Sequence, residues 1–341
     1  MLNGQNGVFR PGQYDGRDVA LKQLKLHNDS DKLVKEFTGE IKIMSRLRHA
    51  NVIPFLGFTM TPQCLIIQEL AHNGDVRTYL QAFARAPQGP PSMQQLVMAV
   101  DIARGMEYLH TFPGSPVLHR DLKTPNLLLD RDFRVKITDF GISREKELSL
   151  GQTGIMTVCG TPIWTAPEIL RGDTYNEKSD VFSFSICVWE VRQRPIVCTV
   201  FRLSFSVPNK GPTHCLQLWG FTMPYAELGL GPVEVAIRVL GDDLRPQVLP
   251  SMPHFFADLM QRCWAGNPAD RPCFQRLPGQ QGIVVEIEQH AEAIGVGKIS
   301  LPVDSQAVRP QLMRQAKSDG SSVDSIASFP SSDSDGDHNA F

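Results

Sequence analysis

The most informative segment of the sequence reads His119-Arg120-Asp121-Leu122-Lys123-Thr124-Pro125-Asn126. Two short runs with strand character follow at 127–129 and 135–138, on either side of a polar turn. Further on come Asp139-Phe140-Gly141 and Gly160-Thr161-Pro162-Ile163-Trp164-Thr165-Ala166-Pro167-Glu168. A lone Asp in such a loop is most often a capping residue. Several motifs in one order indicate instead a shared chemical site.

Together these motifs resemble the catalytic loop, the metal-binding turn and the Ala-Pro-Glu boundary of the eukaryotic protein kinases. Val19-Ala20-Leu21-Lys22 lies upstream, as the kinase pattern requires. The stretches 47–53, 101–110 and 244–246 are similar to the tyrosine-kinase-like group of Ser/Thr kinases, which includes the Raf and mixed-lineage families. The resemblance covers about residues 8–293.

The resemblance implies an α+β fold with two lobes. A small β-rich N-lobe with one helix would span 1–68, a hinge 69–75, and a larger, mainly helical C-lobe 76–293. Residues 191–222 are longer than the short connection that kinases of this group have there, so they form an atypical insertion. Residues 294–341 are expected to be a disordered tail, because a stretch rich in Ser and Asp buries too little apolar surface to offset its ordering entropy.

The composition restricts the class of protein further. Thirty-four Lys and Arg residues stand against 36 Asp and Glu, and a formal net charge of -2 argues against a nucleic-acid partner. No apolar run is long and continuous enough to span a membrane. The seven Cys residues include no Cys-x-x-Cys pair, so we expect a reducing, cytoplasmic compartment rather than a disulfide framework.

The resemblance implies phosphoryl transfer from ATP with Mg²⁺, a reaction in which catalysis is mostly positioning and charge neutralisation. Asp121 would accept the proton of the attacking hydroxyl, and Lys123 would sit beside the transferring phosphate as a compact positive charge. Asn126 and Asp139 would hold the magnesium ions, because hard cations prefer amide and carboxylate oxygen.

Lys22 is the expected phosphate-orienting lysine. It shares a strand face with Ala20, because side chains alternate across a strand. The following segment, 30–47, has helical spacing and carries Glu40 on its apolar stripe. The resemblance pairs Lys22 with Glu40 and directs the lysine at the α- and β-phosphates. Glu36, one turn earlier, is the competing partner.

The resemblance places the adenine site at the end of a predicted strand, 63–70. Gln68 would be the gatekeeper, Glu69 and Ala71 would offer main-chain contacts, and Asp75 would reach the ribose. Ala20 completes the expected nucleotide contacts on the neighbouring strand. A strand end followed by an Asn-Gly turn is also typical of an ordinary loop.

The phosphate-covering glycine loop departs from the kinase pattern Gly-x-Gly-x-x-Gly-x-Val. The chain offers only Gly4 and Gly7, with Val8 directly after Gly7, as phosphate-lining residues. We expect the first strand of the hairpin to be absent, and Pro11 removes a backbone donor from the second. This departure leaves two readings open: an active Ser/Thr protein kinase, and a pseudokinase scaffold with weakened ATP binding.

Arg120, next to Asp121, is typical of kinases that are switched on by phosphorylation between Asp139 and Glu168. A phosphate there would engage Arg120 and order the segment, which implies an upstream kinase as a partner. Thr157 is the favoured acceptor, and Ser149 and Thr153 are alternatives. Lys123, together with the Gly-Thr-Pro-Ile-Trp stretch, favours protein substrates with Ser or Thr over Tyr.

The resemblance also assigns structural roles. Asp180 would anchor the backbone of the catalytic loop from a buried helix, and Glu168 would pair with Arg271. His119 and Phe140 would stack in an apolar spine that links the lobes. Each of the two ion-pair candidates could also be a surface pair of little energetic value.

Overall fold

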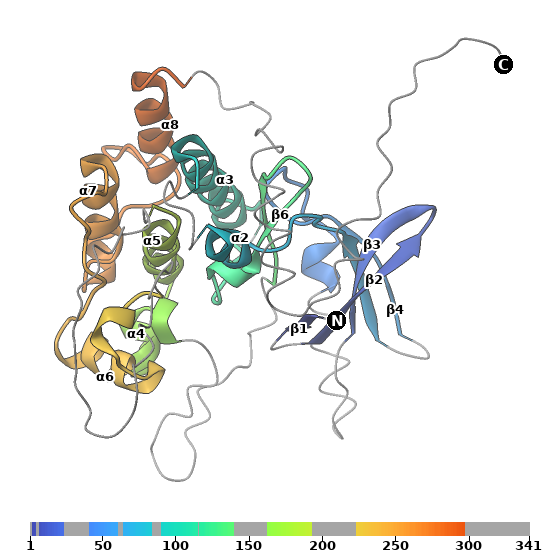
Figure 1. The fold of residues 1–341 in the computed structure, drawn as a ribbon, viewed down its shortest axis with the longest axis horizontal. Coiled ribbons are helices and arrows are strands. Elements are labelled where there is room, and N and C mark those ends of the chain that lie inside the picture. The colour runs from blue at the N-terminus through green and yellow to red at the C-terminus, as the bar shows by residue number, and fades with distance from the viewer. Residues whose placement is uncertain are drawn as a thin grey trace, which may run out of the picture. The chain divides into compact units, whose positions relative to one another are not determined.

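The computed structural model describes eight stretches of the chain, and the statements below concern these: residues 2–4, 7–23, 41–60, 64–83, 90–114, 116–139, 162–192 and 223–296. All of them fall within one structural unit that extends to Val303. An antiparallel sheet comes first along the chain and a mainly helical part follows it (Figure 1). The predicted α+β architecture is therefore confirmed.

The N-terminal sheet has five strands in the order β1-β2-β3-β5-β4. Their bounds are β1 Leu2–Gly4, β2 Gly7–Tyr14, β3 Arg17–Gln23, β4 Phe55–Thr59 and β5 Leu65–Glu69. Asp15 and Gly16 connect β2 to β3 in a two-residue turn in which both have positive φ, 50° and 69°. Asp-Gly is a favoured sequence for such a turn, because its twist matches that of the flanking strands.

The expectation that the first strand is absent is wrong. β1 pairs with β2 in antiparallel register, with Leu2 opposite Phe9 and Gly4 opposite Gly7. Pro11 lies inside β2, opposite Ala20 of β3. The pairing with β1 ends at Phe9, so the rest of β2 has a partner on one side only, and a sheet edge tolerates a residue without an N–H.

The C-terminal part is built from helices around a buried one, α5 (Lys178–Arg192), which contacts α3 (Ser92–His110) and α7 (His254–Cys263) (Figure 1). Every residue of α5 after Lys178 is buried. A helix that is buried all round needs partners for its polar side chains, and the site described below supplies them. The remaining helices are α2 Val76–Ala82, α4 Pro167–Arg171, α6 Pro232–Gly241 and α8 Ile283–Ala293, with short 3-10 turns η1 Thr124–Asn126, η3 Pro162–Trp164, η4 Ala226–Leu228 and η5 Pro268–Asp270.

A small hairpin connects the two parts. It consists of β6 (Leu127–Leu129) and β7 (Val135–Ile137), as the sequence predicts. Val52, just before β4, forms a parallel bridge with Ile137, and Asp75 bridges Leu128. Through these bridges the hairpin is held to the segment before β4 and to the residue that precedes α2.

Several expectations fall on residues outside the described stretches. They include Glu36 and Glu40, most of the insertion (193–222) and the tail from 297 onward. The predicted helix 30–47 is described only from Ile41, and its helical part ends at Met44. Among the described helices, none is both long enough and apolar enough to cross a membrane.

Candidate active site

The loop between α3 and β6 brings together two expected catalytic side chains, Asp121 and Lys123, and the expected metal ligand Asn126. Lys123 Nζ lies 2.8 Å from Asp121 Oδ2 and 3.0 Å from Oδ1. Asn126 Nδ2 donates to the carbonyl oxygen of Asp121 at 2.8 Å and to its Oδ2 at 3.1 Å. The Asp121 carboxylate is thus held in one orientation beside a compensating positive charge.

Lys22 and Asp139 form an ion pair that joins the sheet to the helical part. Lys22 Nζ on β3 lies 2.8 Å from Asp139 Oδ1, just after β7, and only 1% of the lysine side chain is exposed. Burial by itself would raise the pKa of Asp139, but the Lys22 ammonium together with the charges of His119 and Lys123 outweighs it, so the pKa is lowered and the carboxylate is ionised. The Asp139 backbone has a positive φ of 61°.

The two clusters are neighbours. The Thr138 N–H, one residue before Asp139, donates to the carbonyl oxygen of Asn126 at 3.0 Å. Lys123 is among the charges that lower the pKa of Asp139. Lys22 on β3 therefore converges with Asp121, Asn126 and Asp139, which lie about 100 or more positions further along the chain on either side of the β6–β7 hairpin.

Asp180 on α5 anchors the start of the catalytic loop, as predicted. Its carboxylate accepts the backbone N–H groups of His119 and Arg120, each at 2.9 Å, and contacts His110 Nε2 at 2.9 Å. Burial would raise the pKa of Asp180, but the His110 hydrogen bond and the nearby imidazoles lower it overall. These bonds hold Arg120 at a positive φ of 66°, an unfavourable conformation for a residue with a side chain.

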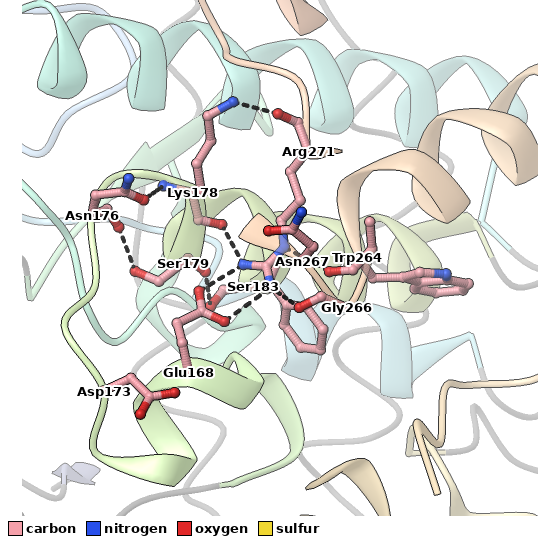
Figure 2. A network of polar contacts seen from close by, with 12 residues as sticks. Glu168, Asp173, Asn176, Lys178, Ser179, Ser183, Trp264, Gly266, Asn267 and Arg271 are labelled. Atoms are coloured by element: carbon pink, nitrogen blue, oxygen red, sulfur yellow. Dashed lines mark hydrogen bonds and ion pairs between the residues drawn. The ribbon is translucent and has the colours of Figure 1, made fainter. Parts of the chain in front are cut away.

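The predicted pairing of Glu168 with Arg271 is also confirmed (Figure 2). Arg271 Nη1 and Nη2 meet the two Glu168 carboxylate oxygens at 2.7 and 2.9 Å. The guanidinium also donates to the carbonyl oxygens of Ala265, Lys178 and Gly266. Both side chains are buried, so this is no exposed surface pair.

The expected adenine contacts lie where β3 and β5 run side by side. Ala20 is opposite Gln68, and Val19 is opposite Glu69. The Glu69 N–H already donates to Pro54 O at 3.0 Å, so a contact from Glu69 to adenine would use its carbonyl oxygen. Ala71 lies two residues after Glu69, the last residue of β5.

Asp75 is a helix cap in this structure. Its Oδ1 accepts the Thr78 N–H at 2.9 Å and its Oδ2 accepts the Thr78 hydroxyl at 2.7 Å, at the start of α2. Burial raises the pKa of Asp75. Its carboxylate would have to share these bonds with a ribose hydroxyl.

Gly4 and Gly7 face each other at the end of the β1–β2 hairpin, and Val8 lies opposite Gln23 of β3. Phe9 is a further site residue that was not predicted. Counted from Gly4 and Gly7, Phe9 takes the Val position of the pattern Gly-x-x-Gly-x-Val, and it lies opposite Lys22, whose Nζ is 6.0 Å from the centre of the Phe9 ring. Val8 was chosen for this position because it is a valine, whereas the spacing from Gly4 and Gly7 identifies Phe9.

Three further expectations lie outside the described residues: the partner Glu40, the stacking residue Phe140 and the phosphorylation site Thr157 with its alternatives. Arg120, which would receive that phosphate, has its guanidinium carbon 5.5 Å from the centre of the Tyr175 ring.

The family model for protein tyrosine and serine/threonine kinases matches residues 3–280 of this chain. The chain belongs to the protein kinase family. This kinase is 38% identical over 268 residues to the probable serine/threonine-protein kinase drkC of Dictyostelium discoideum, and the match covers 78% of this chain and 31% of drkC.

Other kinases match to a similar extent. Identity is 36% over 280 residues with the probable serine/threonine-protein kinase drkA of Dictyostelium discoideum, covering 80% of this chain and 38% of drkA. It is 34% over 275 residues with the serine/threonine-protein kinase CTR1 of Arabidopsis thaliana, covering 80% of this chain and 30% of CTR1. The chain spans about a third of the length of these relatives. The predicted resemblance to the tyrosine-kinase-like Ser/Thr kinases is confirmed.

Proposed function

We propose that this kinase domain transfers the γ-phosphate of ATP to Ser and Thr hydroxyls of protein substrates. The observation that carries the proposal is the convergence of Lys22, Asp121, Asn126 and Asp139. Lys22 Nζ and Asp139 Oδ1 are 2.8 Å apart, although the two residues lie 117 positions apart in the sequence. Phosphoryl transfer needs positioned charge more than covalent chemistry, and this cluster supplies both signs of charge in fixed places.

The residues present fit a divalent metal such as Mg²⁺. The amide Nδ2 of Asn126 is engaged with Asp121, so its Oδ1 is the atom that can coordinate a cation, and the Asp139 carboxylate is ionised. Within the described stretches, no group of three or more His, Cys, Asp or Glu residues could hold a metal by itself. Asn126 and Asp139 would hold the ions together with the phosphates of ATP, and the ions would neutralise charge on the transferring phosphoryl group.

The chain's own side chains have separate tasks in this proposal. Asp121 accepts the proton of the substrate hydroxyl, and Lys123 supplies positive charge beside it at 2.8 Å. Lys22 orients the α- and β-phosphates while its ion pair with Asp139 connects the two parts of the domain. Gly4, Gly7 and Phe9 lie at the end of the hairpin that would cover the phosphates.

The alternative of a pseudokinase scaffold rested on the incomplete glycine loop. Because β1 is present and pairs with β2, the expected absence of this strand no longer supports a pseudokinase. No observation on the described residues favours the scaffold over the enzyme.

Substrate choice and regulation are further parts of the proposal. Lys123 and the similarity to Ser/Thr kinases support Ser and Thr as acceptors. Phosphorylation of Thr157 by an upstream kinase would give Arg120 a charged partner. The described free thiols, Cys64, Cys187, Cys263 and Cys273, support a reducing, cytoplasmic location.

The test is phosphate transfer from radiolabelled ATP to a generic basic protein in the presence of Mg²⁺, with phosphoamino-acid analysis of the product. Asp121→Asn is the matched variant, because it keeps the size of the side chain and removes the base. We expect label on Ser and Thr, and at least about a 100-fold lower kcat in the variant. Equal transfer by the two proteins would refute the proposed function.

A further inference from the structure

The buried helix α5 carries two carboxylates, and the phosphoryl-transfer site so far accounts for only one of them. Asp180, near its start, anchors the beginning of the catalytic loop. Glu190 lies near its end, about 15 Å further along the helix axis. Only 4% of Glu190 is exposed, so its polar atoms need partners within the protein.

Glu190 joins two segments of the chain through a single oxygen atom. Its Oε2 accepts the hydroxyl of Thr124 at 3.0 Å and the indole N–H of Trp164 at 2.7 Å. Thr124 and Trp164 are themselves 0% and 3% exposed. A contact among these three residues was not predicted from the sequence.

The position of Thr124 makes this contact relevant to catalysis. Thr124 opens η1, directly after Lys123 and two residues before Asn126, and those two side chains hold the Asp121 carboxylate. Trp164 ends η3, just before α4, and its carbonyl oxygen accepts the Ser183 hydroxyl at 2.8 Å. Asp180 and Glu190 therefore fix the two ends of the catalytic loop to the same helix.

The charge state of Glu190 is sensitive to pH near neutrality. Burial raises the pKa of Glu190 to about 7, while the bonds from Trp164 and Thr124 act in the opposite direction. The other ionisable groups that face it are Arg77 of α2, the α2 cap Asp75, and Cys187 on α5 itself. Burial raises the pKa of the Cys187 thiol well above its ordinary value, so Cys187 stays neutral and Glu190 is the group that titrates.

We propose that Glu190 is a positioning residue for phosphoryl transfer: its ionised carboxylate ties the catalytic loop, through Thr124, to Trp164. This inference rests on the proposed kinase activity. A hydrogen bond to an ionised acceptor is about twice as strong as one to a neutral acceptor, so protonation of Glu190 loosens both bonds at once. A neutral Gln side chain could accept the same two hydrogen bonds without burying a charge. Compared with Gln, the carboxylate makes these hydrogen bonds stronger and makes their strength depend on pH.

The first test measures the contact itself and needs no enzymatic activity. The chain has four Trp residues, so a protein labelled with ¹⁵N-tryptophan gives up to four indole N–H signals, and Trp164→Phe identifies the one from Trp164. We expect this signal to shift with a midpoint near pH 7 in the unaltered protein and to stay constant in Glu190→Gln. A Trp164 signal that does not titrate, or that titrates equally in both proteins, overturns the inference.

The second test measures kcat and KM for ATP between pH 6 and pH 8.5. At pH 8 we expect Glu190→Gln and Thr124→Val each to lower kcat by about tenfold, with the KM for ATP changed less than about twofold, because the bonds act on the loop and not on the nucleotide. At pH 6 the unaltered protein and Glu190→Gln should have similar kcat values. Glu288→Gln on α8, a half-exposed carboxylate that pairs with Arg104, is the control and should leave the profile unchanged.

The outcomes separate this inference from the proposed function. If the protein transfers phosphate but Glu190→Gln has the same pH profile and kcat, the positioning role is refuted and the kinase activity stands. If the protein transfers no more phosphate than Asp121→Asn, the proposed function and the positioning role fail together. Thermal unfolding of each variant at the assay pH shows whether a lower kcat comes from loss of the folded protein.

Discussion

Replacing Arg271 by Met should destabilise the domain more than any substitution of an exposed charge. The variant removes both bonds to Glu168 and the three bonds to the carbonyl oxygens of Ala265, Lys178 and Gly266 (Figure 2). It also leaves the Glu168 carboxylate, only 4% exposed, without its compensating charge. Removing one partner of a buried ion pair costs about 3–5 kcal/mol in the free energy of unfolding.

The measurement is thermal and urea unfolding, with one variant on each side of the pair. About 3–5 kcal/mol corresponds to a fall of about 10 °C in Tm for a domain of this size. Glu168→Gln should cost less than Arg271→Met, because Arg271 keeps its three carbonyl partners. The double variant Glu168→Gln, Arg271→Met should be more stable than Arg271→Met, since no charge is left bare.

The matched control lies on the same short helix as Glu168. Arg171 pairs with Asp173, but the two side chains are 45% and 53% exposed. Arg171→Ala should therefore change the free energy of unfolding by less than about 1 kcal/mol. If Arg271→Met and Arg171→Ala lower Tm equally, then burial does not give the Glu168–Arg271 pair a larger contribution to stability than an exposed pair has, and the prediction is refuted.

Three further outcomes follow from the described contacts. Gly105→Ala on α3 should lower the free energy of unfolding in urea by about 1–3 kcal/mol, because the new Cβ would lie 2.9 Å from the backbone oxygen of Asn51. Unchanged stability would mean that the backbone around Asn51 moves to accommodate the methyl group. Asp180→Asn should destabilise the protein at pH 7 and progressively less in acid. The lowered pKa of Asp180 gives stability that is present above the ordinary carboxyl pKa and is lost as pH falls through the native pKa. A loss of stability that does not change with pH would contradict this prediction. Glu190 has a raised pKa, so its contribution to stability is full below the ordinary pKa of a Glu side chain and is lost as pH rises through about 7; Glu190→Gln should therefore raise Tm at pH 8.5 but not at pH 5, and a constant difference would exclude a native pKa near 7.

The parts of the site that the sequence predicts are those carried by motifs of contiguous residues. Asp121, Lys123 and Asn126 lie in one loop, so their spacing alone nearly determines that they meet. The long-range partners Asp180 and Arg271 were predicted from family resemblance and confirmed by their bonds.

What the sequence did not predict depends on neighbours that no local pattern reveals. The β1–β2 hairpin escaped prediction because β1 is short and Pro11 disfavours a strand, while the sheet order leaves Pro11 at a position with one neighbouring strand. The contact of Glu190 with Thr124 and Trp164 exists only because α5 is buried among segments distant in the sequence. Neither the residue types nor their spacing carries a signal for it.

The sequence separation of Glu168 and Arg271 has a consequence for biosynthesis. The two residues are 103 positions apart, so the carboxylate leaves the ribosome long before the guanidinium that neutralises it. At roughly 5–20 residues per second, about 5–20 s separate the synthesis of the two residues. For about 4–14 s of that time α5 is complete, while α7, which it contacts in the folded protein, is still being made. During that interval the apolar surface of α5 that α7 later covers is open to chaperones, and slower translation between α5 and α7 would lengthen the exposure.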